Sequence, residues 1–568
     1  MSTKLKLLII GIVVAFLAIV GIGGAATYYF LTNTPKNTYL LSEQESAKSW
    51  KEYFNDRFEN ETEFQDKMKD ESYKTSFKFG AEVSDSLVSQ LGIPKSVIDS
   101  TNIVFNVGHD PKAKNSKLGI EPTIADNKIG NFQWSADKNN QYLETPLFKD
   151  IYKVKNNEIK KGIEKATGES LDSTDGQEIT NDSLNLNTIL SSSQISQDQI
   201  DKISKRYSDL FVDQLDDDNF EKDKEKVKIF DDEEELKKVT MNLSEKDTKK
   251  IVVAILEEAK KDEDIKNIVE KQGNVKEYDK EIKDLLKKAK DEDVKNYPKV
   301  KSIIYVDGKE ILKRDLTITN KDNEKVRIQG TNVIDDGVQL DYKVSAPGED
   351  GGLTLKGKST GKDEISDKYD LEINENSYST TTLKLDNKSK VDGDKRTDKG
   401  KVTIAPSSGQ SFDLNYDHNL TTDTKNNQQK QKLNVDFDVN GENIKLIMDG
   451  KTELKKDIKF KKDGAIDFNT LSDSEVDDLT KEIEDKLQDL GEDLCKRYSI
   501  IREEWLYVDN KIVQHIPLFL IKKWYLIAYI LLLFLAVLAV MIGVNQVNEK
   551  GGGGGGGGGG IRRLRLES

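Results

Sequence analysis

Cysteine is almost absent from this chain of 568 residues, and Cys495 is its only copy. No internal disulfide bond can form, and the residues before Cys495 contain no thiol at all. Secreted eukaryotic proteins of this size usually carry disulfide bonds. A large extracytoplasmic part without cysteine is more typical of a protein on a Gram-positive bacterial surface. The glycosylation sequons at 60–62 and 242–244 are therefore attributed to chance in an Asn-rich chain.

Histidine is nearly as scarce, with only His109, His418 and His515. Zinc sites require clustered histidine or cysteine ligands, and three separated histidines do not provide a cluster. An EF-hand calcium loop needs alternating acidic ligands, a central glycine and a terminal glutamate. Neither acidic run, at 212–223 or at 391–400, has this spacing. We therefore predict no metal and no cofactor.

Catalytic patterns are also scarce. Neither H-E-x-x-H nor C-x-x-C occurs. Paired carboxylates of the kind that cleave glycosides cannot be singled out among 102 acidic residues. His109 stands next to Asp110, but the proline that follows predicts a turn there. With no catalytic residue to name, we predict that the protein is not an enzyme.

Positive charge is in deficit, because 87 lysines and arginines face 102 acidic residues and the net charge is -15 at pH 7. Nucleic acid binding needs a basic surface for phosphate contacts, so nucleic acid is not a predicted partner. A bare anionic membrane surface is disfavoured for the same reason. The acidic excess is interpreted as a device for solubility.

What the chain does contain is a continuous apolar run at 7–31, LLIIGIVVAFLAIVGIGGAATYYFL. About 20 residues suffice to cross the hydrocarbon core of a bilayer. Lys4 and Lys6 precede the run, which predicts a cytoplasmic N-terminus and an extracytoplasmic main body at the cell membrane. The alternative is a signal peptide cleaved at 24–26. The run is too long for one, and the aromatic residues 28–30 continue it, so we predict an uncleaved anchor.

Residues 524–544 are equally apolar and predict a second transmembrane span, so the lipid bilayer is a predicted partner. Two spans would place the arginines of 562–565 in the cytoplasm, as the positive-inside bias favours. Lys522 and Lys523 weakly favour the opposite orientation. The sequence leaves one-pass and two-pass topologies open.

The C-terminal part differs in composition from the rest. The residues after Cys495 hold five of the ten arginines and two of the four tryptophans. Residues 551–560 are consecutive glycines, which behave as a flexible coil. We interpret this part as foreign to the original gene, through fusion or a change of reading frame. The tail 496–550 and the linker with its basic end, 551–568, therefore carry no functional hypothesis.

Four segments precede that tail. They are a cytoplasmic tip and anchor at 1–35, a helix with a first β region at 36–146, a mainly helical segment at 147–300, and an antiparallel β meander with a closing helix at 301–495. The pattern L-S-x-x-[DE] occurs three times, each time before an amphipathic helix. We predict Ser42, Ser244 and Ser472 as the N-cap residues of those helices.

Strict alternation of apolar and polar residues dominates 301–468. Asp-Gly or Asn-Gly steps at 307, 440, 449 and 463 predict hairpin turns between the strands. The fold class is therefore α+β, a large antiparallel β-sheet meander packed against amphipathic helices. The apolar face of such a sheet needs a cover, and we expect the closing helix at 472–490 to form part of it.

One face of this meander is a candidate surface for an apolar ligand. Alternation in two neighbouring strands places six apolar side chains on the same side of the sheet. They are Phe412, Leu414, Tyr416, Leu433, Val435 and Phe437. An ordinary hydrophobic core is the alternative interpretation of the same pattern.

The order of the anchor, the helix NTYLLSEQESAKSWKEYF and the strand SFKFGAEV resembles a family of uncharacterised membrane-anchored exterior proteins of low-GC Gram-positive bacteria. The resemblance covers the chain up to residue 490 and brings no catalytic residues with it. A wide antiparallel sheet with helices on its concave side is also similar to bacterial lipoprotein-carrier folds. That similarity implies a lipid acyl chain held between sheet and helices.

Three hypotheses of function follow. The first is a membrane-tethered exterior protein that binds an envelope component or apolar ligand, such as a lipid, without enzymatic activity. The second is a structural or accessory subunit of a membrane complex such as a transporter, with a membrane protein as its partner. Gly11, Gly21, Gly23 and Gly24 would then permit close helix packing. A cell-envelope hydrolase is the third.

Overall fold

A computed structural model describes residues 33–91, 94–171, 179–192, 197–270, 275–345, 351–376, 379–439 and 441–498. Both predicted spans, 7–31 and 524–544, lie outside these ranges, and so does the glycine-rich end of the chain. Within the described ranges, no helix combines the length and the apolar character that crossing a bilayer requires.

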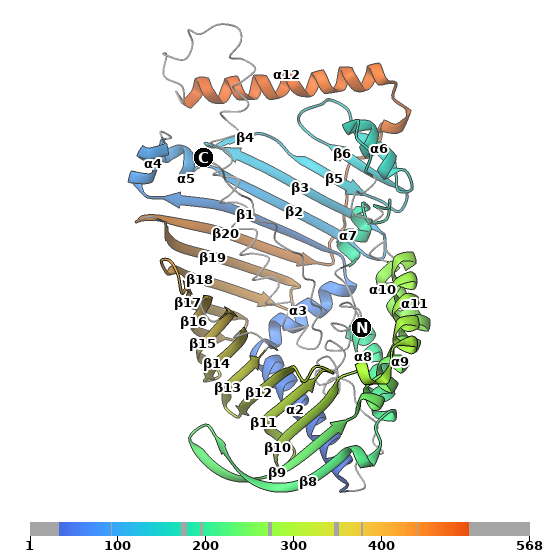
Figure 1. Ribbon diagram of the computed structural model, residues 1–568. Helices are drawn as coiled ribbons and strands as arrows, with labels where there is room; N and C mark the ends of the chain where they lie inside the picture. The colour runs from blue at the N-terminus through green and yellow to red at the C-terminus, as the bar shows by residue number, and fades with distance from the viewer. Residues whose placement is uncertain are drawn as a thin grey trace.

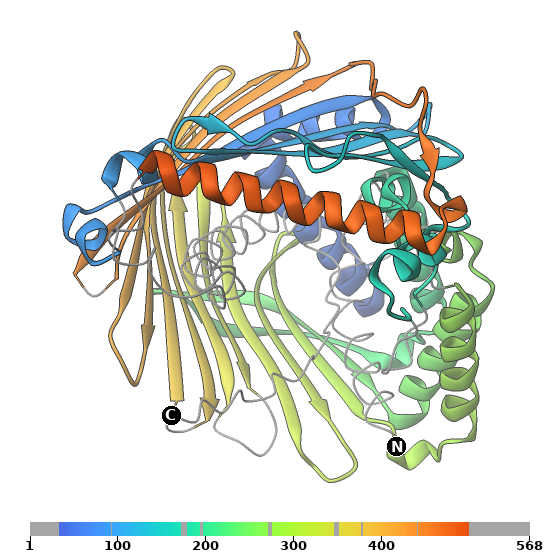
Figure 2. The same ribbon diagram turned by 90° about the horizontal axis from the view of Figure 1, so that it is seen from above.

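The described strands form a single sheet of 21 strands, so the prediction of an α+β fold with a large antiparallel meander is confirmed. Neighbours follow the order β8 to β20, then β1, β2, β3, β5, β6, β7 and β21, with β4 beside β3. All pairings are antiparallel except that of β7 with β21. Figures 1 and 2 show that this long meander curves strongly around a concave face.

The first part of the chain contributes one edge of the sheet. Its strands are β1 (Tyr73–Val83), β2 (Asn102–Asp110), β3 (Asn115–Ile124), β4 (Asn127–Lys128), β5 (Phe132–Ala136), β6 (Asn140–Glu144) and β7 (Tyr152–Lys155). Along its whole length β1 pairs with β20, near the other end of the described chain. The first β region and the later meander therefore share one sheet.

The remaining strands run from β8 to β21. They are β8 (Phe220–Ile229), β9 (Asp232–Leu243), β10 (Lys299–Asp307), β11 (Glu310–Thr319), β12 (Lys325–Ile334), β13 (Gly337–Ser345), β14 (Gly352–Thr360), β15 (Glu364–Asn376), β16 (Ser379–Asp392), β17 (Lys395–Pro406), β18 (Phe412–Asp423), β19 (Gln428–Val439), β20 (Glu442–Leu454) and β21 (Ile466–Asp467). The segment 147–300 is thus not purely helical, since β7 and the β8–β9 hairpin lie in it. Charged residues on both faces of β8 conceal its alternation.

Eleven α-helices accompany the sheet in the described residues. They are α2 (Pro35–Arg57), α3 (Glu59–Asp70), α4 (Asp85–Leu91), α5 (Lys95–Asp99), α6 (Ile159–Thr167), α7 (Leu186–Ser192), α8 (Gln197–Asp213), α9 (Glu245–Lys261), α10 (Glu263–Glu270), α11 (Val275–Asp291) and α12 (Asp473–Tyr498). Figure 2 shows α2 and α3 lying within the curve of the sheet. Tyr39 and Leu40 of α2 join a core cluster with strands β9 to β11 and helices α8 and α9.

Two of the three predicted helix starts are confirmed. Ser244 and Ser472 each form a reciprocal capping box with the acidic residue three positions later. The prediction for Ser42 is wrong, because α2 begins earlier, at Pro35. There the Thr34 side chain accepts the N–H of Asn37, and proline suits the first helical turn. Ser42 lies buried inside the helix.

The predicted turns have mixed outcomes. Gly308 and Gly441 have positive φ and join β10 to β11 and β19 to β20 as hairpins, as predicted. Gly464 also has positive φ, but its turn precedes the short strand β21 and joins no hairpin. Gly450 is not at a corner, because it lies inside β20 opposite Phe77, whose ring leaves no room for a Cβ atom. Glycine is required there by packing.

Helix α12 does not cover the concave face as expected. In Figures 1 and 2 it runs along one end of the molecule, beyond β4. Leu487, on its apolar stripe, is 50% exposed. Helices α2 and α3 lie against the concave face instead. Buried side chains of α2 pack against strands β9 to β12 and form a hydrogen bond with β10 and an ion pair with β11.

Candidate functional site

The six side chains predicted to share an apolar face do lie together. Leu433, Val435 and Phe437 are buried in a core cluster with strands β1 and β20. Phe412, Leu414 and Tyr416 pack against the same cluster and are half-buried. Helices α4 and α5 cover part of it through Leu87, Val88 and Ile98. The structure thus confirms their shared face, and their role in binding a ligand remains a prediction.

An apolar ladder extends this face across five strands. Its rungs pair directly between neighbouring strands from β14 to β18. They are Leu355, Leu371, Leu383, Ile404 and Phe412. Neighbouring strands lie about 4.8 Å apart, so the ladder is about 19 Å long. All five side chains are half-buried.

The ladder lies on the concave face. Leu371 is four residues after Asp367 on β15, so both side chains point to the same side of the sheet. Asp367 forms an ion pair with Arg57 of α2, which fixes that side as the one facing the helix. The sequence prediction included only one of the five rungs, Phe412, although the other four strands alternate in the same way. Pairing across five strands is what brings the rungs together.

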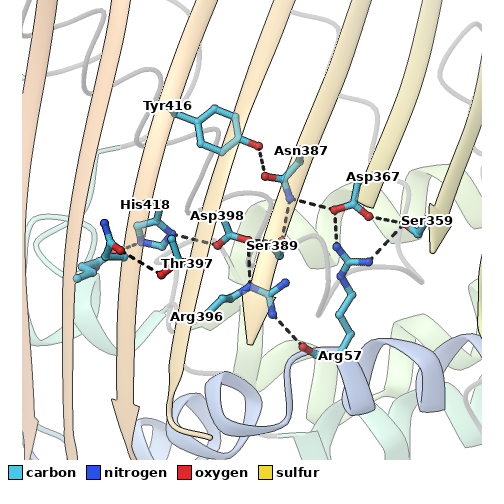
Figure 3. A network of polar contacts seen from close by, with 12 residues as sticks. Arg57, Ser359, Asp367, Asn387, Ser389, Arg396, Thr397, Asp398, Tyr416 and His418 are labelled. Atoms are coloured by element: carbon cyan, nitrogen blue, oxygen red, sulfur yellow. Dashed lines mark hydrogen bonds and ion pairs between the residues drawn. The ribbon is translucent and has the colours of Figure 1, made fainter. Parts of the chain in front are cut away.

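A polar network occupies the same face nearer the ends of these strands (Figure 3). It comprises Arg57, Ser359, Asp367, Asn387, Ser389, Arg396, Asp398 and His418. The Arg57 Nη2 to Asp367 Oδ2 distance is 2.5 Å, and the two side chains are 11% and 5% exposed. Ser359 and Asn387 also donate hydrogen bonds to Asp367. The network therefore pairs a buried carboxylate with three donors, as burial of a charge requires.

The other half of the network joins the end of α2 to β17. Arg396 donates a hydrogen bond of 3.0 Å to the backbone carbonyl of Arg57, and its guanidinium lies 4.4 Å from the centre of the Phe58 ring. Arg396 also pairs with Asp398, which accepts a hydrogen bond from Ser389. A cation at the C-terminal end of α2 is favourable, because the helix dipole is negative there.

The electrostatics of the two carboxylates follow the same logic. Burial alone would raise the pKa of Asp367, but Arg57, Ser359 and Asn387 outweigh it and hold that pKa below its usual value. Burial opposes the shift at Asp398 too. There the partners His418 and Arg396 prevail and lower its pKa. Both carboxylates are therefore charged at neutral pH and act as fixed anchors for α2.

Tyrosine rings separate the polar network from the ladder. Tyr369 packs over Gly357 and Tyr416 over Gly400, each on the directly paired residue of the next strand. The Tyr369 hydroxyl lies 2.7 Å from Ser359 Oγ, and the Tyr416 hydroxyl donates to Asn387 at 2.9 Å. Each ring thus presents a polar tip to the network and an apolar body toward the ladder. The concave face changes from polar to apolar along the strands.

Residues 352–361, GLTLKGKSTG, match the letters of a phosphate-binding loop and of a serine nucleophile elbow. Both motifs require a turn between a strand and a helix. These residues instead form β14 and the turn that follows it. Ser359 is buried, and its hydroxyl donates to the Asp367 carboxylate. The segment therefore has neither the phosphate cradle nor the exposed hydroxyl that the motifs imply.

Neither described histidine has a serine on one ring nitrogen and a carboxylate on the other. His418 Nδ1 lies 3.6 Å from Asp398, but its other ring nitrogen faces Gln431, and Ser389 bonds the carboxylate rather than the ring. His109 is fully buried between Ser116 and Ser191. Asp110 forms the predicted turn, accepting the next backbone N–H groups. Among the described residues, no group of three or more His, Cys, Asp or Glu is arranged to hold a metal.

No protein-family model matches this chain, and no curated protein does. Among solved structures, it is similar to a loop-deletion mutant of OmpT, an outer membrane protein of Vibrio cholerae. The identity is 9%, with 67% of this chain and 98% of that one covered and a TM-score of 0.16. It is also similar to the CymD monoaromatic hydrocarbon channel, at 7% identity, 78% and 98% coverage and a TM-score of 0.15. Likenesses this low carry no argument about this chain.

Proposed function

We propose that this protein is a non-enzymatic, membrane-tethered extracytoplasmic protein that binds an apolar envelope component, such as the acyl chain of a lipid. The apolar ladder is the observation that supports the proposal. Its five side chains are half-buried on the concave face, next to a core cluster whose members are mostly buried. An apolar surface left partly open inside a curved sheet is suited to a long apolar ligand.

The neighbouring polar network supports the same proposal. It holds the end of α2 against the polar part of the concave face through Arg57 and Arg396. A ligand of low polarity would find apolar side chains along the ladder, while in the network Arg57 pairs with Asp367 and Arg396 with Asp398. The tether in this proposal is the apolar run at 7–31.

The first prediction concerns this ladder. A photoreactive fatty acid fed to cells that produce the full chain should crosslink to peptides from 352–406 as well as to the anchor. Leu383→Asp places a charge on the ladder, and we expect it to reduce the 352–406 crosslinks at least fivefold. Mass spectrometry of the digested protein measures both sets of crosslinks, and those of the anchor serve as an internal reference.

The matched control is Lys384→Asp, because Lys384 is the next residue on β16 and is exposed on the opposite face. It should leave the crosslinks unchanged. Leu383→Ala, a milder change, should give an intermediate reduction if Leu383→Asp misfolds. Crosslinks confined to the anchor in the unaltered protein would overturn the proposed function.

A further inference from the structure

Helix α12 is joined to the body of the protein mainly at its beginning. Ser472 and Glu475 cap it reciprocally, with the Ser472 N–H donating to Glu475 Oε2 at 2.7 Å. Lys165 of α6 donates to the backbone carbonyls of Asn469 and Leu471, just before the helix. From there α12 runs along the end of the molecule beyond β4 (Figures 1 and 2).

An apolar stripe follows one side of α12. Val476, Leu479, Ile483 and Leu487 are spaced three and four residues apart, which places them on one face of the helix. The first three are half-buried, and Leu487 is 50% exposed. Apolar residues spaced three and four apart on one helix face are the arrangement through which amphipathic helices contact each other.

The residues beside the stripe are strongly acidic. Between 473 and 490 there are eight acidic residues and two lysines. Asp473, Asp477 and Glu484 flank the stripe on one side, with Asp473 and Asp477 one helical turn apart, and Glu475 and Glu482 flank it on the other. Like charges at this spacing destabilise a helix. A partner that brings positive charge would relieve the repulsion while it covers the stripe.

Charge selects among the partners that could cover the stripe. A second copy of α12 would place acidic flanks against acidic flanks, and an anionic lipid surface would be repelled in the same way. We propose that the apolar stripe of α12 binds a basic amphipathic helix of a partner protein. Lysines or arginines of that helix pair with the carboxylates that flank the stripe. This inference does not depend on lipid binding at the ladder.

The apolar side chains of the partner helix pack on Ile483 and Leu487. These two residues lie in the second half of α12, away from the Lys165 contacts just before its beginning. Ile483 and Leu487 lie one helical turn apart, and a leucine of a facing helix packs into the groove between them.

The test uses the full chain in nanodiscs of phosphatidylcholine, which carries no net charge. The probe is a fluorescent peptide of leucine and lysine, arranged so that its helix has one apolar and one basic face. It should bind with a saturable change in anisotropy. Leu487→Asp should weaken this binding at least tenfold, because it places a charge in the stripe. Leu143→Asp is the matched control, since Leu143 on β6 is 44% exposed, and it should bind as the unaltered protein does.

Three results would overturn the proposal. They are no binding of the peptide, equal binding of a scrambled peptide of the same composition, and unchanged binding by Leu487→Asp. Empty nanodiscs correct for any attraction of the peptide to lipid. Circular dichroism of Leu487→Asp should match that of the unaltered protein, because the side chain is half exposed and contributes little to the core.

Discussion

On the concave face, a few buried charged residues should contribute more to stability than exposed charged residues do. Arg57 and Asp367 are nearly buried and pair at 2.5 Å, whereas Lys362 and Asp336 form a surface pair with side chains 81% and 92% exposed. Removing one partner of a buried pair leaves an uncompensated charge, while exposed pairs contribute little. Comparing a variant of the buried pair with a variant of the exposed pair therefore measures how much the polar network contributes to the docking of α2.

Asp367→Asn should destabilise the protein by about 3–5 kcal/mol, because Arg57 then remains buried without a counter-ion. Asp336→Asn should change the stability by less than about 1 kcal/mol. The midpoint of urea unfolding of the full chain measures both. Replacing the pair by apolar residues, as Arg57→Met with Asp367→Leu, should recover much of the loss. Equal midpoints for Asp367→Asn and Asp336→Asn would contradict this assignment.

His109 gives the fold a dependence on pH. Its burial lowers its pKa from 6.5 to about 4, with the charge of Asp110 opposing the shift. In the window between these values the unfolded chain binds a proton that the folded chain excludes, so stability falls as the pH falls from 6.5 towards 4. The loss levels off below the lower value, at about 3 kcal/mol.

Urea unfolding at pH 7 and pH 5 checks this prediction. The drop in midpoint between the two should be smaller for His109→Gln than for the unaltered protein, because glutamine does not titrate. Both proteins share the contribution of their carboxylates, so the difference isolates His109. The same drop in both proteins would show that His109 is not the responsible group.

At the scale of elements, the packing of some neighbouring strands depends on a tyrosine ring of one strand that lies over a glycine of the next. Gly330 of β12 pairs directly with Tyr342 of β13, and an added Cβ atom would overlap the tyrosine ring. The Tyr342 hydroxyl donates to Asn332 at 2.5 Å. Gly80 of β1 differs, since its Cβ would meet only the Thr101 carbonyl oxygen at 3.9 Å.

Gly330→Ala should destabilise the protein by about 1–3 kcal/mol, because the ring must move and the hydroxyl contact is lost. Gly80→Ala should be close to neutral, since the space is open and its φ is not positive. Thermal unfolding followed by circular dichroism compares the two variants. A smaller effect for Gly330→Ala than for Gly80→Ala would mean that the ring does not depend on the glycine.

At the scale of the whole molecule, strand β1 is the element that connects the two β regions into one sheet. It lies between β2 and β20 and so joins the first β region to the end of the meander. Phe79 and Val83 of β1 complete the core cluster that contains Leu433 and Val435. Without β1, the edge of β20 and this apolar cluster would both be open to solvent.

A fragment of residues 301–470 should therefore aggregate when it is produced alone, since exposed edges and apolar clusters promote association. Co-production of residues 33–144, which include β1 to β6, should restore soluble material. Size-exclusion chromatography distinguishes the two cases. A monodisperse fragment 301–470 that unfolds cooperatively would show that the meander is an independent domain.

Local features of the sequence are sufficient to predict many elements. Alternation predicts the strands of the meander, and Ser244 and Ser472 begin helices because a cap needs only nearby backbone groups. The β8–β9 hairpin escapes prediction because charged residues flank β8 on both faces. The prediction of a turn at Gly450 is wrong for a different reason. The Phe77 ring that requires a glycine there belongs to a strand far away in the sequence.

The sequence by itself determined the α+β class, most strands, two helix caps and the corner at Gly308, because each depends on residues close together in the chain. Only the tertiary structure decided which strands are neighbours. That decision aligned Leu355, Leu371 and Leu383 into a ladder and brought Arg57 to Asp367. Strand register and helix docking depend on packing between distant segments, and no local pattern encodes the partner.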